Sequence, residues 1–171
     1  MMKQVPEDMP RVNFLISLLV QFPEIFTIYY NIAVTRLKIT FMLKKPLEKG
    51  EYIRFQKYFR QCQDIYSKLK ENEDAAPKLE RTSIESWTLL EVTWEKEGIY
   101  LEEINLVCSL VLSHFQSDVF IDLSRETYPI SSTSKEEESY YEYLLSRKNG
   151  GEQEENLFAF RDSGKVYVFD R

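Results

Sequence analysis

The hydrophobic period of this sequence changes along the chain, and this change constrains the fold more than any other feature. Over residues 37–43 apolar and polar side chains alternate, which places every second side chain on one face of a β-strand. Beyond Gly50 the apolar spacing lengthens to three and four, which is typical of one helix face. That stripe consists of Tyr52, Phe55, Phe59, Cys62, Tyr66 and Leu69. The same switch recurs downstream, so the pattern predicts an α+β fold.

The predicted fold is a single domain over residues 1–171, with a mostly antiparallel sheet of about five strands. Two main helices are expected across one face of the sheet, together with a short buried N-terminal helix. The expected strands lie at residues 24–30, 36–43, 82–95 and 119–123, and in a C-terminal hairpin at 156–161 and 165–169. The main helices are expected at residues 47–71 and 101–115, and a further helix at 134–147. Residues 148–156 are predicted to form a flexible acidic linker before the hairpin.

The run of residues 12–22 is apolar on nearly every side of the helix that it predicts. It is shorter than the roughly twenty residues that a membrane span needs, and Pro23 ends it. Phe14 and Leu18 belong to this surplus of apolar side chains. Either the domain buries the helix completely, or a second chain covers part of it. We expect a homodimer or another protein partner at these residues.

Composition excludes some classes of partner. The 22 basic and 28 acidic residues give a net charge of −6, which disfavours nucleic acid and anionic membranes as partners. Cys62 and Cys108 both fall on apolar helix faces, so we expect buried, reduced thiols rather than a disulfide. The absence of a secretory signal in this sequence predicts a cytoplasmic protein.

Few residues suggest chemistry. The single histidine, His114, has no recognisable nucleophile beside it, and the chain lacks the closely spaced Cys and His residues of a zinc site. Its five glycines fit neither the phosphate-binding loop nor the dinucleotide fingerprint. The sequence therefore predicts no catalytic residue, no metal site and no cofactor.

Tyr140, Tyr141 and Tyr143 lie within one turn of the helix expected at residues 134–147, and they cannot all face inward. Tyrosine is enriched at protein interfaces, so these residues join Phe14 and Leu18 as candidate partner-binding residues. The leading hypothesis is a non-catalytic intracellular protein that acts through protein–protein interaction or self-association. The alternative is a regulatory domain that binds a small molecule or nucleotide, or an enzyme that uses carboxylates.

Overall fold

The described part of the chain forms one antiparallel sheet of six strands in the order β3-β4-β2-β1-β5-β6. A computed structural model describes residues 11–31, 33–71, 76–96, 98–122, 156–162 and 165–170. The helices are α1 (Arg11–Gln21), α2 (Lys49–Leu69), α3 (Leu101–Phe115) and the short 3₁₀ turn η1 (Gln116–Asp118). The strands are β1 (Thr27–Asn31), β2 (Arg36–Leu43), β3 (Lys78–Ile84), β4 (Trp87–Glu95), β5 (Asn156–Asp162) and β6 (Lys165–Asp170).

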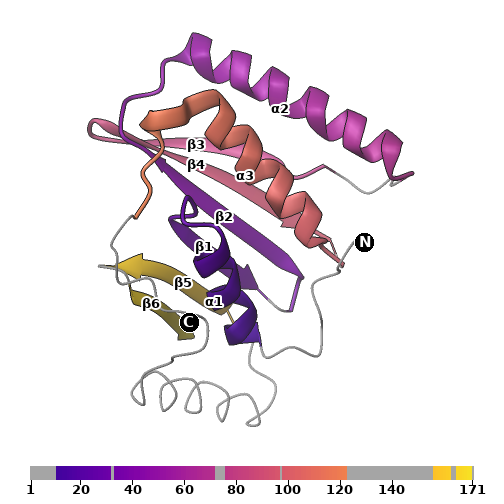
Figure 1. Cartoon of the computed structure of the whole chain (residues 1–171), viewed down its shortest axis with the longest axis vertical. Helices are drawn as coiled ribbons and strands as arrows, with labels where there is room; N and C mark the ends of the chain where they lie inside the picture. Colours follow the sequence, from indigo (N-terminus) through magenta and orange to yellow (C-terminus); the bar gives the residue numbers. More distant parts are fainter. Residues whose placement is uncertain are drawn as a thin grey trace.

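The helices lie against the same face of the sheet, which we call the inner face (Figure 1). α1 packs on β5 and β6, and α3 runs across β2 and β4. α2 lies farther out, beside α3 and next to the edge strand β3. Within the described residues the molecule therefore has two layers, the sheet and the helices on its inner face.

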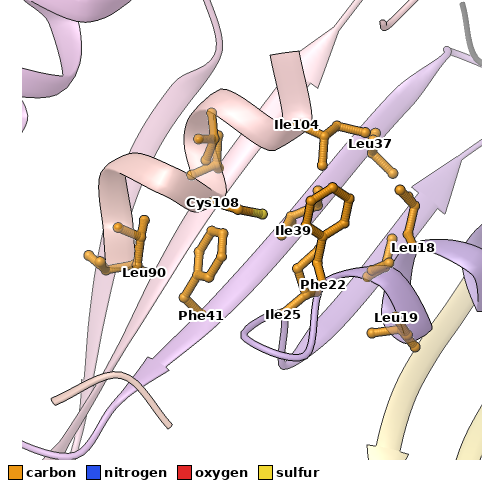
Figure 2. Close-up of a cluster of buried hydrophobic side chains, with 14 of the residues drawn as sticks. Leu18, Leu19, Phe22, Ile25, Leu37, Ile39, Phe41, Leu90, Ile104 and Cys108 are labelled. Carbon is orange, nitrogen blue, oxygen red and sulfur yellow. The ribbon is translucent and has the colours of Figure 1, made fainter. Parts of the chain in front are cut away.

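Alternation along each strand decides which side chains enter the core. In β2 the residues Leu37, Ile39, Phe41 and Leu43 are fully buried, and in β4 the corresponding inner residues are Leu90, Val92 and Trp94. Side chains of α1, β2 and α3 meet these in one cluster (Figure 2). On the opposite face, which we call the outer face, most side chains of β2 and β4 are half-buried and partly polar.

The apolar helix α1 is buried by its own chain. Phe14 is 7% exposed and Leu18 is 1% exposed. The inner face of the C-terminal hairpin contributes to this cover, because α1 contacts both β5 and β6. The apolar side chains of α1 that exceed one packed face are thus buried within a single chain.

The α+β class, the antiparallel sheet and the C-terminal hairpin are confirmed. The sheet has six strands rather than about five, because the segment expected as one strand at 82–95 contains the end of β3, a turn and all of β4. Glu85 and Ser86 form its turn, and Glu85 adopts a positive φ of 52°. The short strand expected at 119–123 is a single bridge between Leu43 and Val119. The helix expected at 134–147 lies outside the described residues, as does the linker except Asn156, the first residue of β5.

Among the described residues, no helix is both long and apolar enough to cross a membrane.

Candidate binding groove between α2 and β3

A cavity of about 360 Å³ lies between α2 and the beginning of β3, and we call it the α2–β3 groove. Its lining on the helix side consists of Gln56, Phe59, Arg60, Gln63 and Asp64. The other side is formed by Ala76, Pro77, Lys78 and Leu79. Apolar, amide and charged side chains therefore converge on one concave site.

The buried stripe of α2 sets the position of the helix beside β3. Phe55 and Phe59 are 0% and 2% exposed, and the Phe55 ring packs against Phe115 of α3 with centroids 4.8 Å apart. The Tyr52 hydroxyl donates a hydrogen bond of 3.2 Å to the Leu79 carbonyl oxygen, which joins the helix directly to β3. The periodic apolar residues thus hold the polar flank of α2 over the start of this strand.

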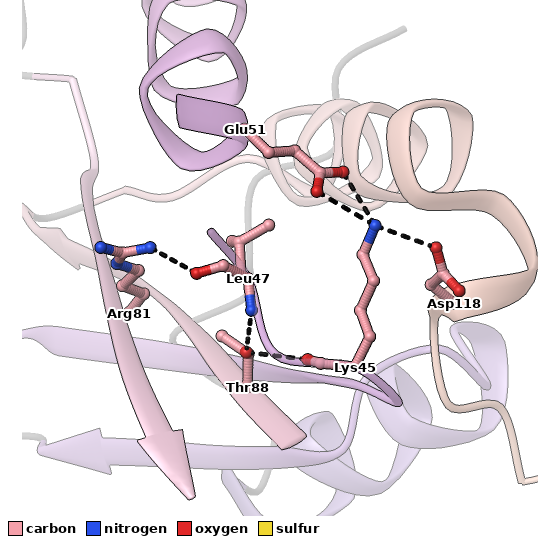
Figure 3. Close-up of polar contacts among 6 residues, drawn as sticks. All are labelled: Lys45, Leu47, Glu51, Arg81, Thr88 and Asp118. Carbon is pink, nitrogen blue, oxygen red and sulfur yellow. Dashed lines mark hydrogen bonds and ion pairs between the residues drawn. The ribbon is translucent and has the colours of Figure 1, made fainter. Parts of the chain in front are cut away.

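Polar contacts fix the entry to α2 (Figure 3). The Arg81 guanidinium of β3 donates a hydrogen bond of 2.6 Å to the Leu47 carbonyl oxygen. The Lys45 ammonium lies 2.9 Å from the Glu51 carboxylate and 3.1 Å from the Asp118 carboxylate. The hydrogen bond that Lys45 donates to Glu51 raises the pKa of Lys45, and Asp118 contributes in the same direction. These contacts tie the first turn of α2 and the residues before it to β3 and to η1.

Gln63 is the buried polar residue of the groove. Its side chain is 5% exposed, although an amide can make up to four hydrogen bonds. Its amide atoms are not among the fully buried polar atoms that lack a partner, so they are open to the groove. A polar group that faces a cavity can bind water or a ligand. The amide of Gln63 can therefore form hydrogen bonds with a ligand in the groove.

The groove has a small excess of positive charge in a protein whose net charge is −6. Arg60 and Lys78 contribute two cations from opposite walls, and Asp64 contributes one carboxylate. Both cationic side chains are exposed, so they can adjust to a ligand without loss of core packing. This arrangement favours a ligand with a negative group.

β3 is an edge strand of the sheet. Within the part of the chain that the structure describes, no strand pairs with the side of β3 that faces away from β4. The backbone groups of alternate residues point to that side in an antiparallel edge. Since the Leu79 carbonyl accepts from Tyr52 there, Arg81 and Ser83 also direct their N–H and C=O groups outward. We call this row of backbone groups the β3 edge.

A second apolar surface lies on the outer face over β5 and β6. Phe160 stacks on Tyr167 with centroids 5.3 Å apart, and on Phe169 with centroids 5.5 Å apart. Phe158 lies 5.9 Å from Phe160, and Phe169 remains 43% exposed. These rings stabilise the hairpin through cross-strand contacts. The α2–β3 groove combines a cavity with amide and charged side chains, so it is the stronger candidate.

The candidate partner-binding residues from the sequence do not come together at the groove. Phe14 and Leu18 are core residues of the single chain. Tyr140, Tyr141 and Tyr143 lie outside the described residues. Contact with a partner through any of these five residues stays a prediction.

The remaining residues that the sequence brought to attention are His114, Cys62 and Cys108. The His114 ring packs on Phe55 at 5.0 Å, and burial lowers the pKa of His114, with smaller effects from Glu51, Lys45 and Arg54.

Both cysteines are free thiols. Cys108 is buried, whereas Cys62 is half-buried. Burial and the Glu24 carboxylate raise the pKa of the Cys108 thiol. In the described ranges, no three His, Cys, Asp or Glu side chains are grouped as metal ligands would be.

Sequence reasoning missed the groove for two reasons. Gln56, Arg60 and Gln63 recur at intervals of four and three beside the apolar stripe, but this spacing also fits an ordinary solvated helix flank. Nothing in the pattern indicated that Gln63 would be buried. The edge itself was not expected, because residues 78–81 were not predicted to be a strand.

Comparisons with known proteins do not assign the chain: no family model matches it, and neither a curated protein nor a solved structure is significantly similar to it.

Proposed function

We propose that this protein acts by binding a segment of another protein chain, which pairs with the β3 edge as an added strand. The observation that carries the proposal is the position of this edge beside a cavity that is lined by the amide of Gln63, a residue only 5% exposed. In strand addition, backbone hydrogen bonds supply affinity, and pockets for alternate side chains supply specificity. The β3 edge offers the first and the α2–β3 groove offers the second.

A second candidate function is the binding of a small molecule in the same groove. A volume of about 360 Å³ lies within the range of small-molecule sites. The open strand beside the cavity favours the peptide, because a small molecule would leave the outward backbone groups of Arg81 and Ser83 unused. Catalysis has less support, because the described residues that line the groove include neither a histidine nor a cysteine.

The test is a selection of binders from a random decapeptide library, displayed with free carboxyl ends and also within a scaffold loop. Selected peptides are synthesised and titrated into ¹⁵N-labelled full-length protein. We expect the largest amide shifts at residues 78–84 of β3 and 56–64 of α2. A selection without binders, or shifts confined to other elements, would contradict the proposal. Shifts limited to the groove with a small anion such as inorganic phosphate would support the second candidate.

A matched pair of variants tests the backbone pairing. Ser83→Pro removes one outward N–H group from the β3 edge, and edge strands tolerate proline. Ser83→Ala changes the side chain but keeps that group. We expect Ser83→Pro to weaken peptide binding by about tenfold, as the loss of about 1.4 kcal/mol implies, and Ser83→Ala to leave it within about twofold. Equal affinities for both variants would exclude strand addition at this position.

A further inference from the structure

We infer that the segment bound at the β3 edge ends in the α2–β3 groove, where its free C-terminal carboxylate contacts Arg60, Lys78 and Gln63. This inference rests on the proposed function and specifies its partner. The class of partner is a protein with an extended, accessible C-terminal tail. Three properties of the described residues lead to it, namely the direction of pairing, the charge of the groove and the buried amide.

The direction of pairing brings the end of the tail to the groove. Every strand pair of this sheet is antiparallel. A segment added in the same sense would run from the Ile84 end of β3 toward Lys78. The groove is lined by Lys78 and Leu79, so it lies where the carboxyl end of such a segment arrives. Antiparallel pairing therefore directs the carboxyl end of an added segment toward the cations of the groove.

The groove has the groups that a terminal carboxylate requires. A carboxylate accepts hydrogen bonds and carries a full charge, and hydrogen bonds to it are stronger when the donor is cationic. The exposed cations Arg60 and Lys78 reach it from two walls, and Gln63 can donate from its buried amide. Phe59 and Leu79 supply apolar contact for the last side chain of the tail. Asp64 is the one acidic group of the lining, and it opposes the carboxylate.

The decisive experiment compares one selected decapeptide as the free acid and as the C-terminal amide, with full-length protein and calorimetric titration. We expect the amide to bind at least about tenfold more weakly, because charged hydrogen bonds are lost. Arg60→Gln and Lys78→Gln should each weaken binding of the acid several-fold and leave binding of the amide nearly unchanged. Lys57→Gln on the exposed side of α2 is the matched control and should alter neither affinity.

Two further variants separate recognition from general charge. Gln63→Leu keeps the buried volume but removes the amide, and it should weaken binding of the acid more than that of the amide. Asp64→Asn removes the opposing carboxylate and should strengthen binding of the acid. Thermal unfolding of each variant shows whether the fold is retained.

The outcomes distinguish this inference from the proposed function. Suppose that peptides shift the amide signals of β3 but bind equally well as the acid and as the amide. That result would overturn the C-terminal contact and leave strand addition intact. A requirement for an internal Asp or Glu, with no effect of the terminal group, would identify a side-chain carboxylate and also overturn it. If bound peptides leave the amide signals of β3 unchanged, both the proposed function and this inference are wrong.

Discussion

At the scale of single residues, Thr88 shows how one side chain joins two distant parts of the chain. It is 0% exposed in β4, and its hydroxyl donates a hydrogen bond of 2.9 Å to the Lys45 carbonyl oxygen. The Thr88 hydroxyl oxygen also accepts a hydrogen bond of 3.0 Å from the Leu47 N–H group (Figure 3). Both bonds hold the connection from β2 to α2, so Thr88 helps to position one wall of the groove.

Thr88→Val should therefore destabilise the protein although it preserves side-chain volume. The valine leaves one buried donor and one carbonyl without their partner, and each such group costs about 1–3 kcal/mol. We expect the free energy of unfolding in urea to fall by about 2 kcal/mol or more. Thr93→Val is the matched control, because Thr93 is half-buried on the outer face of the same strand, and it should change stability by less than about 0.5 kcal/mol. A loss of unfolding free energy below about 0.5 kcal/mol for Thr88→Val would show that the two hydrogen bonds contribute little.

At the scale of elements, Arg161 attaches the C-terminal hairpin to the N-terminal helix. Its guanidinium donates hydrogen bonds to the Leu19 carbonyl oxygen, at the end of α1, and to the Pro23 carbonyl oxygen at 2.7 Å. Carbonyl groups at a helix C-terminus lack intrahelical donors and carry partial negative charge, so a cation stabilises them. Burial lowers the pKa of Arg161, while the nearby carboxylates of Asp122 and Glu24 raise it.

Arg161→Met should loosen this junction. The substitution keeps an apolar stem but removes two charged hydrogen bonds, so we expect a loss of about 2 kcal/mol in unfolding free energy. Amide exchange should accelerate most in β1 and β5, because the hairpin pairs with the rest of the sheet only through β1. Arg36→Met is the control, since Arg36 and Glu95 form an exposed ion pair and its loss should cost less than about 1 kcal/mol. Uniform acceleration of exchange in all strands would argue against a local role for Arg161.

The elements also show which parts of the fold a sequence can predict. β2 and α3 begin and end where the pattern placed them, because alternation and the spacing of three and four were uninterrupted there. β3 was missed because its turn at Glu85 and Ser86 contains no glycine, proline, asparagine or aspartate. The groove depends on that missed strand and on the burial of Gln63. Both arise from the packing of α2 against β3, which local periodicity does not encode.

At the scale of the whole molecule, the placement of α1 bears on assembly. The sequence suggested that a second chain covers this helix, since its apolar residues exceed one packed face. The structure shows Phe14 and Leu18 covered by the sheet and the hairpin of the same chain. Because the same chain buries Phe14 and Leu18, α1 gives no reason to form a homodimer. If the mass in solution exceeds the 20.4 kDa of one chain, another surface, such as the β3 edge, is the better site for contact.

Leu18→Lys and Phe14→Lys should therefore unfold the protein rather than change its oligomeric state. A lysine in either place buries a charge without a partner and removes a core side chain, and the combined cost approaches the 5–15 kcal/mol that stabilises a typical domain. Ser17→Lys is the matched control on the same helix, because Ser17 is exposed and should accept lysine with little change. Circular dichroism and light scattering on all three variants report fold and mass together. A folded monomer obtained from a dimer by Phe14→Lys would show that α1 forms an interface, and that single-chain burial of this helix is incomplete in solution.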